Sequence, residues 1–261
     1  MHKQNYILKT SNLSIGYDSK KEKTVIASSI NIQLEKGKLI ALVGKNGIGK
    51  STFLKTITQI IPPVEGTIFL DEKLLSQYDG KALAQKLSLV LTEQLPPSNL
   101  TIYEIVALGR QPYTNWLGTI TEEDQKHIEN AIALTGIETY QHKKHYEVSD
   151  GQLQKALIAR ALAQDTSIII LDEPTTHLDL VHKVTVLKLL QKLTHETGKT
   201  ILYSTHDVDL AIQLCDEIIV FSENKVVQDQ PCNLIADGTF TNLFQNENIV
   251  FDATIGKFKI V

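Results

Sequence analysis

One segment determines how this chain folds: Leu39-Ile40-Ala41-Leu42-Val43-Gly44-Lys45-Asn46-Gly47-Ile48-Gly49-Lys50-Ser51-Thr52. Its first residues are aliphatic, as in a buried strand, and the part from Gly44 fits the pattern G-x-x-x-x-G-K-[ST] ahead of a helical segment. Glycines let the backbone curl so that successive N–H groups face one anion, and the positive end of the following helix faces the same anion. The pattern predicts a phosphate-binding loop, in which Lys50 bridges the β- and γ-phosphates and the Ser51 hydroxyl ligates Mg²⁺.

A second segment places two acids at the end of another aliphatic strand. Residues 168–171 read Ile-Ile-Ile-Leu, and Asp172 and Glu173 follow them. Because buried aliphatic side chains hold such a strand rigidly, we expect Asp172 to be positioned over the Mg²⁺ shell. Glu173 can then polarise the attacking water as a general base. Alone, this pair would more often be a solvated strand end or a helix cap, but the phosphate-binding loop favours a shared hydrolytic site.

Short β-branched runs alternate with helical segments along the chain. This alternation predicts an α/β fold with a buried parallel sheet flanked by helices. Strands are expected at 38–43, 67–70, 88–91, 167–171, 200–204 and 217–221, and helices at 49–61, 101–110, 122–135, 151–163, 180–195 and 208–215. In the fifth helix, the spacing predicts a core-facing stripe formed by Leu180, Val184, Leu187, Leu190 and Leu193.

The beginning of the chain has a different pattern. Residues 7–15 and 29–34 alternate between apolar and polar side chains, as antiparallel strands do when one face is buried. The run from 25 to 34 is expected to pair with the first strand across a turn at 18–23. The sequence therefore predicts an antiparallel β-subdomain ahead of the phosphate-binding loop.

Between Thr92 and about Ala163 the sequence becomes rich in helical signals and poor in strand signals. An inserted helical subdomain at 92–163 is the simplest explanation. Since no Pro/Gly/Ser-rich linker divides the chain, we expect one domain over residues 5–247, followed by a short C-terminal extension at 248–261.

Composition excludes several classes of protein. The 261 residues carry a formal net charge of −4, which gives the whole surface no electrostatic attraction for nucleic acid or anionic lipid. The longest aliphatic runs, 168–171 and 218–221, are far shorter than the roughly 20 apolar residues of a membrane span. Residues 1–6 show no secretory signal, so export is not expected. Cys215 and Cys232 are too few for a disulfide framework or a metal cage.

A third motif, Val148-Ser149-Asp150-Gly151-Gln152, precedes the two acids, and His206 follows the next predicted strand. In order and spacing these motifs resemble those of ATP-binding cassette (ABC) ATPases, over residues 7–227. The family signature is Leu-Ser-Gly-Gly-Gln, so Val148 and Asp150 depart from it. A carboxylate near phosphates would weaken ATP binding, and we expect Asp150 to turn outward. The resemblance implies a P-loop NTPase core with a mainly parallel sheet, an antiparallel β-subdomain and an inserted helical subdomain.

The resemblance also implies a homodimer that holds ATP between two copies. Ser149, Gly151 and Gln152 of one copy would face the γ-phosphate bound by the other, so that neither copy alone surrounds the nucleotide. Three further residues match the family's adenine-stacking aromatic, γ-phosphate histidine and dimer-crossing aspartate, respectively Tyr17, His206 and Asp179.

One family element is displaced. A glutamine that contacts Mg²⁺ and the attacking water is expected directly after the strand at 88–91, but the chain reads Leu91-Thr92-Glu93-Gln94 there. The alignment puts Thr92 at that place and Gln94 two residues later. Gln94 is the candidate for the metal contact, and the assignment among Thr92, Glu93 and Gln94 stays open.

Residues 101–110 and 111–116 look like the segment of iron-siderophore, haem and vitamin B12 importers that receives a permease coupling helix. Tyr113 and Trp116, after Pro112, are typical interface anchors, and burial within the subdomain explains them almost as well. This resemblance implies an ATP-hydrolysing subunit with two transmembrane permease subunits and, indirectly, a substrate-binding protein, on the cytoplasmic face of the plasma membrane and without nucleic acid. An exporter ATPase or a soluble regulatory ABC ATPase is the alternative.

Overall fold

The computed structural model describes residues 5–19, 22–91, 98–223, 225–241, 243 and 249–260. The chain divides into two compact units, which are residues 1–77 together with 200–261, and residues 78–199. Among the described residues, no helix combines the length and the apolar character that crossing a membrane requires.

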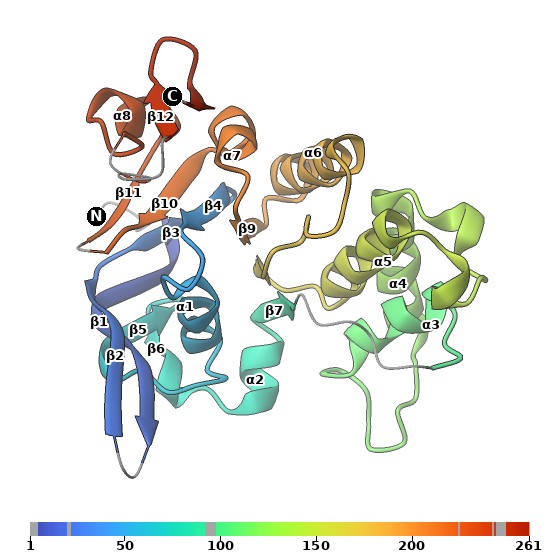
Figure 1. The fold of residues 1–261 in the computed structure, drawn as a ribbon. Helices are drawn as coiled ribbons and strands as arrows, with labels where there is room; N and C mark the ends of the chain where they lie inside the picture. The colour runs from blue at the N-terminus through green and yellow to red at the C-terminus, as the bar shows by residue number, and fades with distance from the viewer. Residues whose placement is uncertain are drawn as a thin grey trace. The chain divides into compact units, whose positions relative to one another are not determined.

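The first unit contains the antiparallel sheet that the sequence predicts. β1 (Tyr6–Ser19) pairs with β2 (Glu22–Ile30), with β3 (Gln33–Glu35) and with β5 (Glu65–Leu70), and β5 pairs with β6 (Lys73–Leu74). In Figure 1 the β1–β2 hairpin is the long blue ribbon. η1 (Leu75–Gln77) follows β6.

One predicted strand belongs to a different sheet from the one expected. The run at 67–70 was expected in the parallel sheet, but it forms part of β5, which is antiparallel to β1. Its burial explains the difference, because Ile68 and Leu70 are buried while Thr67 is exposed. Such alternation is typical of an antiparallel strand with one covered face, whereas a central parallel strand is buried on both faces.

A second group of strands in this unit carries the phosphate-binding loop. Its order is β11-β10-β4-β9, with β10 (Glu217–Phe221) and β9 (Thr200–Thr205) parallel to β4 (Leu39–Gly44) and β11 (Val226–Asp229) antiparallel at the edge. Every residue of β4, β9 and β10 is buried. Val43 is in register with Thr205, and Gly44 with Phe221, so the carboxyl ends of the three strands lie at one edge.

Helices and a hairpin follow the strands in the described part of this unit. α1 (Lys50–Ile57) follows β4, α7 (Val208–Leu214) follows β9, and α8 (Pro231–Ala236) follows β11. Aromatic rings pack at the hairpin of β12 (Ile249–Asp252) and β13 (Lys257–Ile260). The centroid of the Phe251 ring lies 5.3 Å from that of Phe240 in a tilted arrangement and 5.0 Å from that of Phe258 in an edge-on one.

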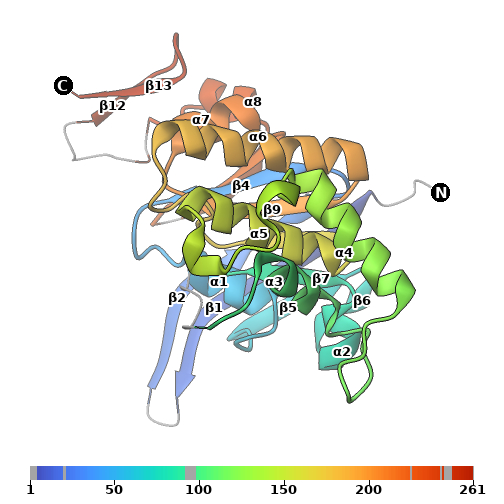
Figure 2. The ribbon, with the colours of Figure 1, turned by 90° about the vertical axis from the view of Figure 1, so that its right-hand side faces the viewer.

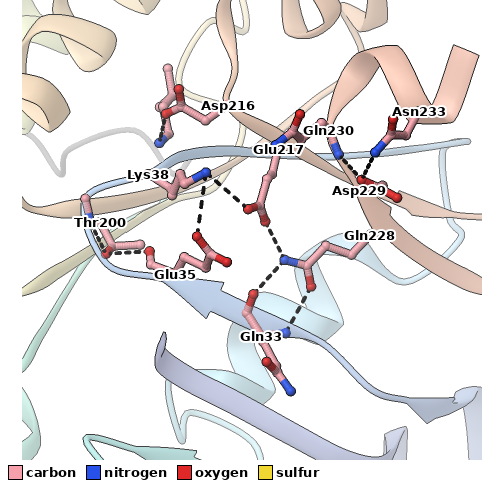
Figure 3. A network of polar contacts seen from close by, with 12 residues as sticks. Gln33, Glu35, Lys38, Thr200, Asp216, Glu217, Gln228, Asp229, Gln230 and Asn233 are labelled. Carbon is pink, nitrogen blue, oxygen red and sulfur yellow. Dashed lines mark hydrogen bonds and ion pairs between the residues drawn. The ribbon is translucent and has the colours of Figure 1, made fainter. Parts of the chain in front are cut away.

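A polar network fixes the opposite, amino-terminal ends of β4 and β10 (Figure 3). The Lys38 ammonium lies 3.6 Å from carboxylate oxygens of both Glu35 and Glu217. Glu217 accepts a hydrogen bond from Gln228 at 2.8 Å, and the Leu39 N–H donates to Asp216 at 2.8 Å. Because this end of β4 is anchored, the position of the loop at its other end is fixed by the strand.

The second unit is built around α5 (Asp150–Ala163), against which α3 (Ile102–Ala107) and α4 (Glu122–Thr135) pack (Figure 2). It also contains the parallel pair β7 (Leu87–Val90) and β8 (Ile168–Leu171), the short α2 (Gly80–Ala84) and the long α6 (Leu180–Thr197). Its remaining helical turns are η2 (Leu108–Arg110), η3 (Glu138–Tyr140) and η4 (His145–Glu147).

Two helix predictions need correction at their ends. α1 was expected to continue to Ile61 but ends at Ile57, because Gln59 has φ 62° and two prolines follow at 62 and 63. The core-facing stripe of α6 begins later than expected. Leu187, Leu190 and Leu193 are fully buried, whereas Leu180, in the first turn after the Asp179 cap, is 67% exposed.

An ion pair inside the helical unit joins η2 to the start of α4. Arg110 Nε donates to Asp124 Oδ1 at 2.8 Å, Arg110 Nη1 donates to the Ala163 carbonyl at 2.8 Å, and both side chains of the pair are buried. Burial alone would raise the pKa of Asp124, but hydrogen bonds from Thr121 and Arg110 outweigh it and lower the pKa from 3.8 to about 2. The folded state therefore favours the ionised carboxylate.

We predict a specific acid sensitivity from this pair. A depressed folded-state pKa contributes stability above pH 3.8 that is lost as the pH falls towards 2, and the loss amounts to about 1 kcal/mol by pH 3. Urea unfolding at pH 5 and pH 3 should show this loss in the wild type and not in Asp124→Asn, which is already less stable at pH 5. Glu122→Gln, in the same helical turn, is the control and should titrate like the wild type. Equal pH dependence in all three would contradict the assignment.

Candidate active site

The loop between β4 and α1 has the conformation that its glycines predict. Gly47 and Gly49 have φ of 76° and 110°, in the left-handed region that favours glycine. At Gly49 a Cβ atom would also lie 2.7 Å from Ile26 Cγ2, so a side chain has neither a suitable backbone conformation nor room. Gly49 is the N-cap residue of α1, which begins at Lys50.

Lys50 is held inside this loop. Its side chain is buried, and Nζ donates to the carbonyls of Gly44 at 2.8 Å and Lys45 at 3.1 Å. Nζ also lies 3.4 Å from Nδ1 of His206, which follows β9. Because β9 is parallel to β4 and in register with it, the topology brings His206 to the edge where the loop begins. The arrangement concentrates positive charge and N–H donors at one point, which suits a phosphate chain.

Tyr17 lies at the same loop. Its hydroxyl is 3.5 Å from Oγ1 of Thr52 in the first turn of α1, and its side chain is exposed. An exposed aromatic ring next to a phosphate-binding loop can stack on a nucleobase. Such stacking contacts only the face of the base and so does not depend on which base it is. The first unit thus brings together three of the predicted groups: Tyr17, the loop 44–52 and His206.

The two acids lie in the second unit at the carboxyl end of β8. The Asp172 N–H donates to the Val90 carbonyl at 2.8 Å, which extends the ladder between β7 and β8 by one bond, and Asp172 is 7% exposed. Glu173 has φ 47°, a left-handed conformation that costs a non-glycine residue free energy. Its Oε2 accepts a hydrogen bond from Thr176 at 3.1 Å. Backbone strain of the kind seen at Glu173 is typical of functional sites.

The signature segment forms the start of α5. Ser149 is the N-cap residue, and its Oγ accepts from the Gln152 N–H at 3.3 Å while Gln152 Oε1 accepts from the Ser149 N–H at 3.1 Å. Ser149 and Asp150 are both exposed. The exposed end of a helix with a serine cap can bind an anion with its remaining N–H groups.

Asp179 forms the equivalent cap of α6. Its Oδ1 accepts from the backbone N–H of His182 and lies 2.8 Å from Nδ1 of the same residue. Hydrogen bonds from the His182 backbone and side chain lower the pKa of Asp179. His182 was not among the residues predicted from sequence, although the spacing Asp-x-x-His at a helix start is the pattern that could have indicated it.

One predicted element cannot be placed. Thr92, Glu93 and Gln94 lie outside the described residues, so the metal contact assigned to Gln94 stays a prediction. Within the described part of the chain, no group of three or more His, Cys, Asp or Glu side chains could hold a metal ion. A Mg²⁺ site with few protein ligands and several phosphate or water oxygens is compatible with that finding.

The segment after α3, at residues 111–117, has an exposed aromatic side chain. The Trp116 side chain is 91% exposed, so the alternative that it is buried in the subdomain is wrong. Tyr113 is partly buried, and its ring centroid lies 3.9 Å from Cζ of Arg110. Leu117 beside Trp116 is also exposed, which gives this loop an apolar surface.

Comparison with known proteins identifies the family. The ABC transporter family model matches residues 27–176. An uncharacterized ABC transporter ATP-binding protein of Methanocaldococcus jannaschii is 37% identical over 97% of this chain and 87% of its own length. The iron(3+)-hydroxamate import ATP-binding protein FhuC of Bacillus subtilis is 37% identical over 85% of this chain and 81% of its own length.

A solved structure agrees with these relatives. The dimeric post-hydrolysis structure of the ATP-binding cassette MJ0796 with ADP and Pi is 28% identical, covers 86% of this chain and 99% of that one, and superimposes with a TM-score of 0.72. The predicted fold class is thereby confirmed. The chain belongs to the ABC transporter family, in which it is an ATP-binding and ATP-hydrolysing subunit.

Proposed function

We propose that this chain hydrolyses ATP to drive the import of a ferric chelate, in sites that two copies of the chain share. The observation that carries the ATP site is the buried Lys50 ammonium, enclosed by the loop carbonyls and next to His206. The loop 44–52 would bind the phosphates and Tyr17 would stack on adenine. The ATPase domain is taken as residues 5–247, with the helical insertion at about 92–163 and an extension at 248–261.

The chemistry assigns a separate role to each acid. Glu173 accepts a proton from water as the water oxygen attacks the γ-phosphorus, and the bond to the bridging oxygen breaks to release ADP. Lys50 and His206 stabilise the charge on the transferred group. The hard oxygen donors of Ser51 and Asp172 fit Mg²⁺, which would neutralise phosphate charge when bound.

A second copy supplies the remaining groups. Ser149 caps α5 with its side chain exposed, and Asp179 caps α6 with its side chain exposed, so both are available to another molecule. Leu180 and Val181, next to Asp179, are 67% and 73% exposed, so the start of α6 has an apolar surface that a second copy would cover. A homodimer in which Ser149, Gly151, Gln152 and Asp179 of one copy meet the nucleotide of the other explains these exposed positions. The dimeric cassette with ADP and Pi supports this arrangement.

The relatives support a cargo and a set of partners for this chain. Because FhuC is an ATP-binding protein of iron(3+)-hydroxamate import, a ferric siderophore is the favoured cargo over haem or cobalamin. Two transmembrane permease subunits would bind the chain at the cytoplasmic face of the membrane and change conformation with ATP hydrolysis. A substrate-binding protein would deliver the chelate to them. The exposed loop with Trp116 and Leu117 is the surface that we assign to the permease.

The proposal predicts cargo-specific transport. The chain, purified from membranes with its bound permease and reconstituted in proteoliposomes with MgATP inside and the substrate-binding protein outside, should accumulate a radiolabelled ferric hydroxamate. Liposomes with the nonhydrolysable analogue in place of ATP provide the background. Accumulation of labelled cobalamin or haem instead would overturn the assigned cargo, and transport without ATP would overturn the assigned role of the chain.

A further inference from the structure

The imidazole of His182 lies between two groups that the proposed site requires. One ring edge meets Asp179, since Nδ1 lies 2.8 Å from Oδ1. Another part of the ring faces Gly151 in the first turn of α5, where a Cβ atom would lie 2.9 Å from Cδ2 and 3.5 Å from Cγ. One side chain thus touches both the cap of α6 and the signature segment.

The ring gives the glycine at 151 a structural reason, in addition to the phosphate contact proposed above. Gly151 does not have a positive φ, so its backbone conformation suits any residue. Helix propensity by itself would favour alanine at this position, because glycine is destabilising within a helix. A methyl group here would lie 2.9 Å from Cδ2 of His182, a distance that real Cβ contacts essentially never show, so the ring would have to shift from its contact with Asp179 to admit it.

The hydrogen bond defines the ring's tautomer. Asp179 is an acceptor when ionised, and its pKa is lowered by the hydrogen bonds from His182. A contact of 2.8 Å between an ionised carboxylate and Nδ1 therefore requires Nδ1 to carry the proton. The neutral ring is thus the Nδ1–H tautomer, held by the same oxygen that caps the helix backbone.

We propose that His182 is a positioning residue, which fixes the Asp179 carboxylate and the first turn of α5 relative to each other. The inference rests on the proposed shared site, in which both groups meet the nucleotide held by the other copy. A rigid link between them presents Ser149 and Asp179 to the second copy as one surface. Losing the link should impair assembly and turnover while leaving the loop at Lys50 intact.

A double-mutant cycle tests the contact without reference to ATP. Gly151→Ala should lower the midpoint of thermal unfolding in the wild type, because the methyl group meets the ring. In the His182→Ala background the ring is gone, so Gly151→Ala should leave the midpoint unchanged or raise it through helix propensity. The same negative shift in both backgrounds would overturn the contact.

Substitutions that separate ring packing from hydrogen bonding test the positioning role. His182→Ala and His182→Phe, which both lose the hydrogen bond, should lower kcat about tenfold while KM for ATP changes less than about twofold. His182→Asn places an amide N–H near Nδ1 and should restore most of kcat. His195→Ala, a surface histidine on the same helix, is the control and should match the wild type. A kcat of His182→Ala equal to that of the control would overturn the proposal.

A spectroscopic readout distinguishes the failure of this inference from the failure of the shared site. Imidazole ¹⁵N shifts of the isolated chain should show the Nδ1–H tautomer for His182, assigned by its absence in His182→Ala, and should lose this signature in Asp179→Asn. If the signature and the thermal cycle hold but no ATP-dependent dimer forms, the shared site is wrong and the link is correct. An Nε2–H tautomer in the wild type overturns the link itself.

Discussion

The Glu173→Gln variant is expected to bind ATP as the wild type does and to lose about 10²- to 10⁴-fold in turnover, the usual contribution of a general base. The amide has the size of the carboxylate and can still accept the hydrogen bond that Thr176 donates at 3.1 Å. It cannot take the proton of the attacking water. Since ATP then persists between the two copies, MgATP should convert the variant to a stable dimer. Sedimentation measures the dimer, and phosphate release measures the turnover.

The control is Glu196→Gln, the same substitution at an exposed glutamate of α6 that pairs with Lys192 at 3.8 Å. It should hydrolyse ATP at the wild-type rate and form no stable dimer. A Glu173→Gln chain that stays monomeric with saturating MgATP would refute the shared site, whatever its rate. Undiminished turnover would assign the base to another residue.

The sequence alone predicted the parts of the fold in which local pattern and tertiary role agree. The strand before Gly44 is buried on both faces, and its continuous aliphatic run predicts a buried strand of this kind. The α4 helix begins and ends where expected, because Thr121 and Gly136 cap it with local signals. The phosphate-binding loop was predictable for the same reason, since its glycines are required by the backbone itself.

The remainder depends on contacts between distant residues. β5 pairs with β1 and not with a parallel neighbour. This pairing depends on tertiary contacts, which a short apolar run in the sequence does not specify. The exposure of Leu180 follows from where α6 meets its core, and helical spacing cannot show this. The contact of His182 with Gly151 joins the starts of two helices, so neither segment reveals it alone.

Lys50→Ala should lose nucleotide affinity itself, in contrast to the loss of turnover alone at Glu173. Two charge-assisted hydrogen bonds to phosphate oxygens contribute about 1.5–3 kcal/mol each, so their removal should weaken ATP binding at least about a hundredfold. Titration with a fluorescent ATP analogue measures this loss, and the thermal midpoint checks that the variant is folded.

Two control variants test whether the loss of ATP affinity is caused by the position of the Lys50 ammonium. Lys55→Ala removes the same side chain from the last turn of the same helix and should bind ATP normally. Lys50→Arg keeps the charge, but its planar guanidinium is larger than the ammonium that donates to the Gly44 and Lys45 carbonyls and holds its donors in a fixed fork, so we expect it to fail almost as badly as alanine. If arginine restored binding, charge alone would suffice and the enclosed geometry of the loop would have no role. Tight binding by Lys50→Ala would mean that the phosphates lie elsewhere, and the roles assigned to His206 and Ser51 would fail with it.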